Sequence, residues 1–258
     1  MVGCVLVAAG SGVRLGLGTP KALAVVSGRT LLEHAVDCLA RVERPGGDPV
    51  VSVLVVVVPA HELDRCRELV LASWAAHRPQ DPPPLLVVGG ADRQASVAAG
   101  LQRLPPVDTV LVHDAARALA PGTLVSAVAD AVTGGAVAVV PGLPVADTVK
   151  QLSTRSPSTG SGPAGGDVRT VERTLDRASL VTVQTPQGFR ADLLRAVHAA
   201  LVGRDPDAPT GAGDDAGMLE AAGHPVVVVP GHPEAFKVTD PLDLVLAAAV
   251  LTRRAQRG

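Results

Sequence analysis

A glycine-rich turn near the N-terminus is followed by two cations. Residues 8–12 read Ala-Ala-Gly-Ser-Gly directly after an apolar run, and Arg14 and Lys21 follow within the same loop. Backbone N–H groups of such a turn can approach a polyphosphate, and both cations can reach its oxygen atoms. The loop is not a Walker loop, because it lacks Gly-Lys-Ser/Thr, and Leu15 replaces the third glycine of a dinucleotide fingerprint. It therefore predicts polyphosphate binding, with a structural turn carrying exposed cations as the alternative.

A second glycine pair lies between an apolar run and a helix-like stretch. Gly89 and Gly90 permit close contact between the backbone and a flat ligand. Ser96 would then stand on the first helical turn and offer a small hydrogen-bonding group. A simple turn with a helix cap is the alternative interpretation.

A carboxylate and a guanidinium follow the apolar run that ends near residue 113. Asp114 and Arg117 are expected at the carboxyl end of a buried strand, where open α/β sheets bind ligands. Asp114 could serve a metal or hydroxyl groups, and Arg117 could serve a phosphate. A local ion pair between the two is an equal alternative. We interpret the neighbouring His113 as a structural residue.

Further polar segments are individually weak signals. They contain Thr148, Arg177, Thr185, the pair Asp214-Asp215, and Lys237. Each has an ordinary structural explanation, and Asp214-Asp215 in particular is typical of a helix start. The chain shows no serine-hydrolase elbow, no Cys/His metal cluster and no kinase signature.

The elements that must position these residues alternate along the chain. Apolar runs predict strands at Val2–Ala8, Val50–Val58, Leu85–Val88, Thr109–His113, Ala136–Val140 and Val226–Val229. Stretches between them predict helices at Leu31–Arg44, His61–His77, Gln94–Leu104, Leu124–Thr133, Ala191–Leu201 and Pro241–Thr252. This alternation indicates an α/β fold with βαβ units and a mostly parallel sheet. Continuous apolar runs are typical of strands covered on both faces.

One segment breaks the alternation. Of the 15 residues in 153–167, 12 are Gly, Ser, Pro or Thr, a composition that cannot build a core. Alternating segments at 145–152 and 168–175 flank it, which predicts a projecting β-hairpin arm over 145–175 with a flexible tip at 153–167. A lone two-stranded ribbon is marginal in water, so the arm is expected to cover a second subunit in a homodimer.

The composition narrows the class of protein. A chain of 258 residues can form a single α/β domain over 1–258, and no apolar run approaches the roughly 20 residues of a membrane span. The N-terminus lacks the features of a signal peptide. The three cysteines (Cys4, Cys38 and Cys66) have unrelated spacings and form no disulfide or zinc pattern. We therefore expect a soluble, cytoplasmic protein with reduced thiols.

Charge and aromatic content argue against a nucleic-acid partner. The net charge is −2, and the chain contains no Tyr, one Trp and two Phe. The chain therefore lacks the net positive charge that attracts nucleic acid. It also has too few aromatic side chains for single-stranded bases to stack on. A nucleobase would have to be bound by backbone groups and small side chains.

Taken in order, the segments resemble the 2-C-methyl-D-erythritol 4-phosphate cytidylyltransferases. The matching stretches are AAGSGVRL with PKA, GGADRQASV, VLVHDAAR, PVADTVK, TLDR, QTPQGF and FKVT. They run from residue 2 to about residue 247, nearly the whole chain. Their shared order is more specific than any single motif.

The resemblance implies a fold and a reaction. The fold would be a Rossmann-like, mostly parallel mixed sheet of seven strands with helices on both faces and an arm exchanged across a homodimer. The reaction would transfer CMP from CTP to 2-C-methyl-D-erythritol 4-phosphate and release pyrophosphate, in non-mevalonate isoprenoid biosynthesis. A magnesium ion would be held mainly by the triphosphate.

The resemblance also implies roles for single residues. The catalytic cations at the triphosphate would be Arg14 and Lys21. The nucleotide site would comprise Ala8, Ala9, Gly10, Gly12, Gly90 and Ser96. The sugar-phosphate site would comprise Asp114, Arg117, Thr148, Arg177, Thr185 and Lys237, with Thr148 and Arg177 supplied by the partner's arm. No residue is expected to ligate a metal directly.

Some positions depart from the family pattern. Ala22 stands where Gln is frequent, and Ala118 stands where Pro is frequent. Gly213 and Gly217 replace two hydroxyl-bearing residues, so one substrate contact of the family is missing from the sequence.

Three rival functions remain at the level of the sequence. The nearest is a cytidylyltransferase for another polyol phosphate, such as ribitol 5-phosphate. A non-catalytic nucleotide sensor is a second, although binding alone would not need both Arg14 and Lys21. An NAD-dependent oxidoreductase is the third, and the broken dinucleotide fingerprint disfavours it.

Overall fold

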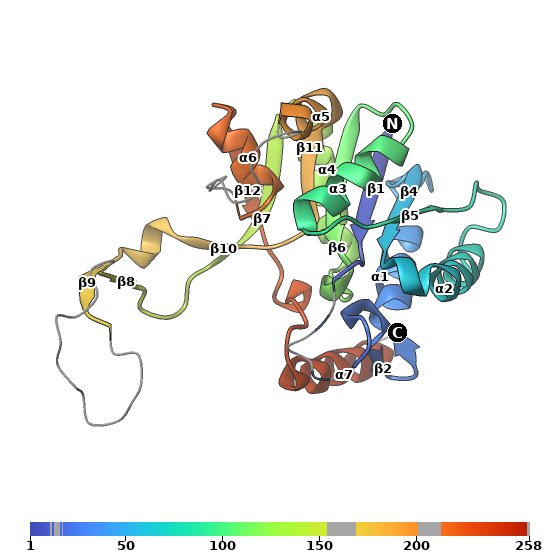
Figure 1. The fold of residues 1–258 in the computed structure, drawn as a ribbon, viewed down its shortest axis with the longest axis horizontal. Coiled ribbons are helices and arrows are strands. Elements are labelled where there is room, and N and C mark those ends of the chain that lie inside the picture. Colours follow the sequence, from blue (N-terminus) through green and yellow to red (C-terminus); the bar gives the residue numbers. More distant parts are fainter. Residues whose placement is uncertain (11, 13–15, 17, 154–168, 201–212, 257–258) are drawn as a thin grey trace.

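A mixed sheet runs through the centre of the computed structural model, which describes residues 1–10, 12, 16, 18–153, 169–200 and 213–256 (Figure 1). Its strands in the described residues are β1 (Val2–Val7), β4 (Val53–Val58), β5 (Leu85–Val88), β6 (Thr109–Asp114), β7 (Ala138–Pro144), β10 (Val181–Val183), β11 (Gln187–Arg190) and β12 (Val226–Pro230). The order is β10-β7-β11-β6-β1-β4-β5, with β12 also paired to β7.

The sheet is mostly parallel, as the alternation of elements predicts. β1 pairs in parallel with β4 and β6, β4 with β5, and β7 with β12, whereas β11 is antiparallel to β6 and β7. In the described residues the sheet has eight strands, one more than the resemblance implies. One of the eight, β10, is a short antiparallel segment that pairs with the end of β7 and precedes β11 in the chain.

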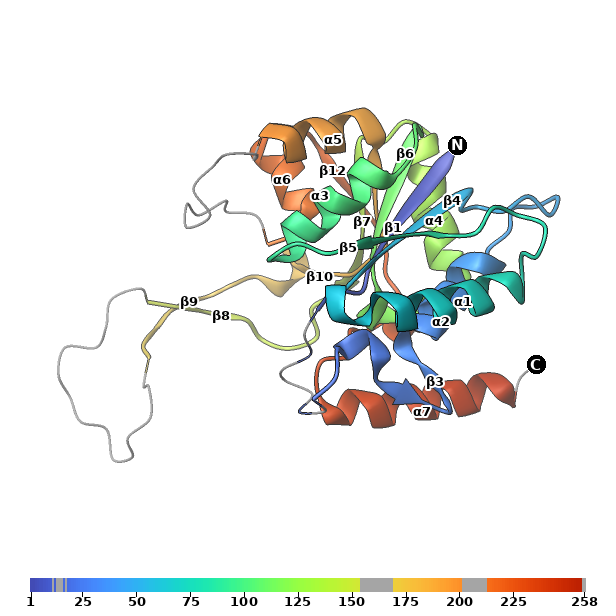
Figure 2. The same cartoon turned by 45° about the vertical axis from the view of Figure 1, so that its right-hand side comes forward.

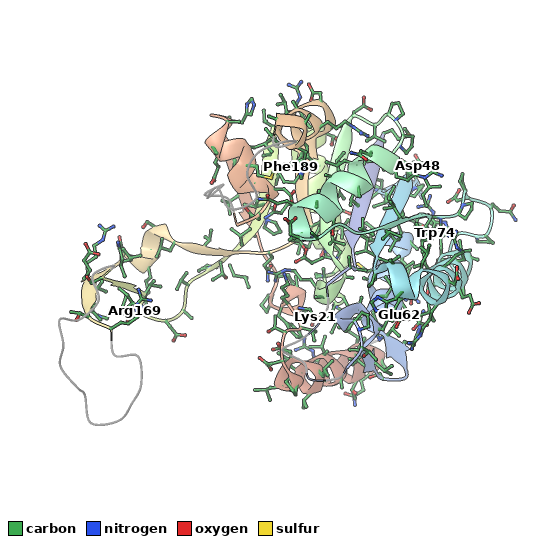
Figure 3. All side chains as sticks on the ribbon, viewed as in Figure 1. Lys21, Asp48, Glu62, Trp74, Arg169 and Phe189 are labelled. Atoms are coloured by element: carbon green, nitrogen blue, oxygen red, sulfur yellow. The ribbon has the colours of Figure 1, made fainter. Side chains whose placement is uncertain are left out.

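Helices cover both faces of the sheet (Figures 1 and 2). One face carries α1 (Leu31–Arg41), α2 (Leu63–Ala75) and α4 (Gly122–Thr133), and the other carries α3 (Arg93–Arg103), α5 (Ala191–Ala200) and α6 (Asp215–Ala221). Successive strand residues alternate between the two layers: Leu6 packs toward the first group, and Val5 toward the second. Phe189 of β11, labelled in Figure 3, is fully buried in the second layer. Both faces are therefore covered, as the apolar runs predict.

A final helix, α7 (Pro241–Ala255), lies below the sheet in Figures 1 and 2, beside the short hairpin of β2 (Val25–Val26) and β3 (Arg29–Thr30). Asp240 begins α7 by accepting hydrogen bonds from the backbone of Leu242 and Asp243. The Asp243 carboxylate accepts in return from Asp240 N, which completes a capping box. None of the helices in the described part of the chain is both long and apolar enough to cross a membrane.

Helix ends differ slightly from the sequence-based expectations. α1 ends at Arg41, three residues early, because Val42 turns to extended backbone. α2 is preceded by a separate turn, η3 (Ala60–Glu62), and α7 continues to Ala255. The expected end of α5 at Leu201 lies outside the described residues.

The arm projects away from the body on one side (Figures 1 and 2). β8 (Lys150–Leu152) and β9 (Val171–Thr174) pair in antiparallel fashion, and every residue of β9 is exposed. This agrees with the predicted hairpin. Most of the tip predicted to be flexible, residues 154–168, lies outside the described residues.

The sequence's one tryptophan lies near the C-terminal end of α2. Trp74 is 2% exposed, and the Arg78 guanidinium stacks 4.5 Å from the centre of its ring. Arg78 also donates a hydrogen bond to the Val51 carbonyl. Arg78 thus connects the end of α2 to the segment that precedes β4, and Trp74 is labelled in Figure 3.

The three cysteines are free thiols. Cys4 is fully buried, and burial raises its pKa well above the ordinary value. Burial raises the pKa of Cys38 and of Cys66 to about 11. These thiols are therefore inert core groups rather than nucleophiles, in agreement with the sequence-based prediction.

Candidate active site

A cleft of about 360 Å³ opens at the carboxyl ends of β1, β5 and β6. This is where open α/β sheets bind ligands. The cleft brings together predicted residues from distant parts of the chain: Ala8, Ala9, Gly10, Lys21, Gly90, Ser96, Asp114 and Lys237. Arg93, which sequence reasoning did not single out, also lines it.

A larger hollow of about 780 Å³ lies between α1 and α4. It contains none of the predicted site residues and does not lie at the carboxyl ends of the strands. The smaller cleft is therefore the candidate site, because it lies at the carboxyl ends of the strands and contains the predicted site residues.

Backbone and small side chains form one wall of the cleft. Ser96 Oγ accepts a hydrogen bond from Gly90 N at 3.1 Å and donates to the Asp92 carbonyl at 2.7 Å. The Asp92 side chain in turn caps α3 by accepting from Ala95 N at 2.7 Å. The wall is thus a narrow backbone slot, suited to a flat ring in a chain with few aromatic residues.

Close packing explains the glycines in this wall. A Cβ atom on Gly89 would lie 2.5 Å from Ala9 Cβ, and one on Gly90 would lie 2.4 Å from Ala95 Cβ. A side chain at Gly90 would therefore displace the start of α3 as well as block a ligand. A Cβ atom on Gly10, by contrast, would meet no atom of the described residues within 4 Å, and Gly10 lines the cleft.

Lys21 lies on the 3-10 turn η2 (Lys21–Leu23), between the sheet and α7 in Figure 3. Its backbone N–H donates to the Gly10 carbonyl at 3.3 Å, which closes the glycine-rich loop. Gly12 has a φ of 70°, and a Cβ there would lie 2.8 Å from Lys21 N. Gly12 thus allows the loop to fold back on Lys21. The predicted Arg14 lies outside the described residues.

A chain of hydrogen-bonded polar groups leads from the cleft into the interior of the protein. Lys237 Nζ donates to Asp114 Oδ2 at 2.6 Å, and Arg93 Nε donates to Asp114 Oδ1 at 3.3 Å. Arg93 Nη1 also donates to Asp215 Oδ2 at 2.6 Å, and Asp215 Oδ1 lies 2.9 Å from His198 Nε2. Each carboxylate therefore faces two nitrogen-bearing partners.

The charge of Asp114 is stabilised by this arrangement. Burial alone would raise its pKa, but the charge of Arg93, followed by that of Lys237, outweighs burial and lowers the pKa to about 2. Asp114 is consequently ionised throughout the neutral range. The equal alternative of a local ion pair with Arg117 does not form, because Arg93 and Lys237 occupy the carboxylate.

Arg117 and Thr185 lie behind Asp114. Arg117, on the turn η4 (Ala115–Arg117), donates to the carbonyls of Ala235 and Val183, and its buried Nε has no partner among the described residues. Thr185 Oγ1 accepts from Asp114 N at 3.0 Å and shares a hydrogen bond with His113 Nδ1. Thr185 thus supports the strand end in this chain.

His113 is fully buried beside Thr185. Burial lowers the pKa of its imidazole to about 4, so the ring is neutral at pH 7. It lies inside the sheet, away from the cleft lining, as a structural residue.

Thr148 and Arg177 lie on the arm and do not line the cleft of their own chain. Both are exposed, and Arg177, on the turn η5 (Arg177–Ser179), donates to the Ala146 carbonyl. The structure therefore brings together the predicted nucleotide wall and the Asp114–Lys237 pair in one cleft. Thr148 and Arg177 lie away from the cleft of their own chain.

Asp214 caps α6, as the structural interpretation of the Asp pair predicts. Its carboxylate accepts from Gly217 N at 2.9 Å and from Gln187 Nε2 at 2.5 Å. Asp215, in contrast, is completely buried and belongs to the hydrogen-bonded chain with Arg93. The motif GGADRQASV contains Arg93, but Asp215 lies 122 residues further along the chain, so no local pattern in the sequence indicated this pair.

The 2-C-methyl-D-erythritol 4-phosphate cytidylyltransferase family model matches residues 2–253. The chain is 48% identical over 251 residues to the protein of that name from Streptomyces avermitilis, covering 97% of this chain and 91% of the relative. It is 49% identical over 252 residues to the Streptomyces coelicolor protein of the same name, covering 97% and 84%.

The fold agrees with these matches. The crystal structure of 2-C-methyl-D-erythritol 4-phosphate cytidylyltransferase from Thermus thermophilus superposes with a TM-score of 0.66 at 33% identity, covering 96% of this chain and 98% of that one. The α/β fold of this chain is thus shared with a solved structure of a protein of that name. The chain belongs to the 2-C-methyl-D-erythritol 4-phosphate cytidylyltransferase family.

Proposed function

We propose that the protein transfers CMP from CTP to 2-C-methyl-D-erythritol 4-phosphate and releases pyrophosphate, in non-mevalonate isoprenoid biosynthesis. The observation that carries the proposal is the composition of the cleft. A backbone slot for a flat base, the loop cation Lys21 and the Asp114–Lys237 pair share one cavity in a chain of this family.

The proposed chemistry needs no general base. An oxygen of the acceptor phosphate is already anionic and attacks the α-phosphorus of CTP, forming a new phosphoanhydride bond. The bond between the α-phosphorus and its bridging oxygen breaks, and pyrophosphate leaves with the electron pair. Catalysis then consists of aligning two anions and stabilising the charge that develops, for which Lys21 and Arg14 are the proposed groups.

We propose that Mg²⁺ enters with the triphosphate. Within the described residues, no group of three or more His, Cys, Asp or Glu side chains could hold a metal ion. The Asp114 carboxylate of the cleft is engaged by Arg93 and Lys237. This donor set fits an ion whose ligands are mainly phosphate oxygens and water, and such an ion neutralises phosphate charge when bound.

We also propose a homodimer in which each arm completes the partner's sugar-phosphate site with Thr148 and Arg177. Support comes from the exposure of both residues and from exposed apolar side chains at the root of the arm. The latter are Val181, Val183, Val227 and Val228, which are 38–50% exposed. A contiguous apolar surface of this kind is typical of protein interfaces.

The partners are expected to be small molecules rather than nucleic acid, and the three free thiols suit a cytoplasmic protein. The test of the function is pyrophosphate release measured with each of the four nucleoside triphosphates and either methylerythritol phosphate or ribitol 5-phosphate. We expect release with CTP and methylerythritol phosphate. Faster release with ribitol 5-phosphate would assign the other acceptor, and CTP binding without release in any combination would indicate a sensor.

A further inference from the structure

Arg93 links the cleft to a carboxylate that lies outside it. It is the first residue of α3, and its guanidinium reaches Asp114 on β6 and Asp215 on α6. Asp114 lines the cleft, whereas Asp215 and His198 do not. The Asp215 side chain is completely buried, while 27% of the Arg93 side chain is exposed.

The buried Asp215 requires an explanation. An ionised carboxylate loses its hydration on burial, and apolar residues of similar volume are often at least as stabilising. Asp215 nevertheless remains charged: burial would raise its pKa, but the hydrogen bond from His198 and the charge of Arg93 outweigh burial and lower it. Asp215, itself held by His198, therefore restrains the Arg93 guanidinium on the side away from the cleft.

The position of Lys237 indicates what the restrained Arg93 guanidinium can do. Lys237 is now paired with Asp114 at 2.6 Å, yet it is the cation expected to meet the acceptor phosphate. An ammonium that turns toward a phosphate leaves its former partner uncompensated. Arg93 remains on the other oxygen of Asp114, so the carboxylate keeps a counter-ion when Lys237 moves.

We propose that Arg93 is a positioning residue: anchored by Asp215 and His198, it holds the Asp114 carboxylate in place and frees Lys237 to bind the phosphate of the acceptor alcohol. This inference rests on the proposed function, because it assigns an acceptor phosphate to Lys237. Arg93 touches neither reacting atom in the proposal, and it acts through Asp114.

The test measures steady-state kinetics of Arg93→Gln and Arg93→Lys with CTP and methylerythritol phosphate. For Arg93→Gln we expect KM for the acceptor to rise on the order of tenfold, with KM for CTP changed less than about threefold. Arg93→Lys keeps the positive charge but loses the planar guanidinium that bonds Asp114 and Asp215 at the same time. Its KM for the acceptor should therefore lie between those of the wild type and Arg93→Gln.

A pH profile separates positioning from simple structural support. The charged or titratable groups around Asp114 are Arg93 from α3, Lys237 after the 3-10 turn η6 (Pro233–Ala235), His113 on β6 and Arg117 on η4. Removing Arg93 raises the pKa of Asp114, so the carboxyl takes up a proton at a higher pH. The acid limb of kcat/KM should therefore move upward by about one pH unit in Arg93→Gln and stay near the wild-type position in Arg93→Lys.

Arg195→Gln is the matched control. Arg195 on α5 is also partly buried and donates to the carbonyls of Leu101, Leu104 and Pro105, but it does not reach the cleft. We expect this variant to lower the melting temperature without changing acceptor KM or the acid limb.

The outcomes are distinct. Wild-type acceptor KM and acid limb in a folded Arg93→Gln would overturn the proposal and leave Arg93 a structural residue. If Arg93→Gln does not fold, Arg93→Lys decides: a raised acceptor KM supports the proposal, and a wild-type KM overturns it. Failure of the proposed function is seen separately, as absent pyrophosphate release by the wild-type protein.

Discussion

Lys21 is the described cation closest in sequence to the glycine-rich loop, and its backbone closes that loop at Gly10. We expect Lys21→Ala to lower kcat on the order of 100-fold or more, with a smaller change in KM for CTP. The reason is that its charge matters most when charge builds up at the α-phosphorus. Steady-state pyrophosphate release is the measurement.

Arg67→Ala provides the control for the loss of a cation, because Arg67 is exposed on α2 and does not line the cleft. Its kinetics should be those of the wild type. Near-normal kcat in Lys21→Ala would remove this residue from the catalytic role. The same experiment with Arg14→Ala extends the test to the cation outside the described residues.

Gly10 offers a cleaner test of the nucleotide wall than Gly90. A side chain at Gly90 collides with Ala95 of α3, whereas a Cβ atom on Gly10 would meet nothing within 4 Å among the described residues. We expect Gly10→Val to keep the wild-type melting temperature and to weaken CTP binding on the order of tenfold, measured by calorimetry. Gly10→Ala should show a smaller loss, and equal affinity across the series would place the base elsewhere.

The sequence predicted site residues wherever a motif follows a strand. Gly10, Gly90 and Asp114 were found in this way, since parallel strands bring their carboxyl ends to one edge of the sheet. Arg93 and Asp215 were not singled out, because an ion pair between residues far apart in sequence leaves no local pattern. They come together because α3 and α6 lie in the same layer of the fold.

At the scale of elements, α6 depends on contacts at its first turn. Asp214 accepts from Gly217 N and from the Gln187 side chain, and the next residue, Asp215, anchors Arg93. We expect Asp214→Ala to lower the free energy of unfolding by about 1 kcal/mol, the usual effect of a lost N-cap. Urea unfolding followed by circular dichroism is the measurement.

Asp214→Asn is the matched variant, since an asparagine side chain can still accept from Gly217 N. It should recover most of the lost stability. If Asp214→Ala is as stable as the wild type, the cap does not limit the stability of α6, and the Gln187 contact is the stronger restraint.

The elements themselves were predicted to different degrees. Valine-rich runs identified β1, β4, β5, β6 and β12 to within a few residues. The central strands β1, β4 and β6 are continuously apolar because both of their faces are buried. In β12, by contrast, Val227 and Val228 are exposed, so its apolar run does not reflect burial within this chain. The segments β10 and β11 were missed, since Gln184–Pro186 interrupts them and reads as a loop motif. Their strand structure comes from pairing with β6 and β7, which a local pattern does not record.

At the scale of the whole molecule, the arm decides whether a site is complete. Thr148 and Arg177 are exposed on a ribbon that projects from the body. In a lone chain, such a ribbon would not be held rigidly enough to position a phosphate. We expect a mixture of Arg177→Ala and Lys21→Ala chains to regain activity that neither variant has alone. One site of each heterodimer would then combine an intact Lys21 with an intact Arg177, giving roughly a quarter of wild-type activity after random exchange.

Subunit exchange is verified independently, with two differently tagged chains purified in succession. Mixing Lys21→Ala with itself under two tags gives the background. Purified heterodimers without restored activity would place Lys21 and Arg177 in the same chain's site, or remove Arg177 from the reaction.

The single tryptophan gives the molecule an optical property that follows from its place in α2. Trp74 is buried beneath the Arg78 guanidinium, and the chain has no tyrosine to contribute emission of its own. Intrinsic fluorescence therefore reports one layer of the protein, that of α1 and α2, and should be silent when nucleotide enters the cleft. Unfolding curves from fluorescence and from far-ultraviolet dichroism will coincide only if that layer and the α3, α5 and α6 layer lose their structure together.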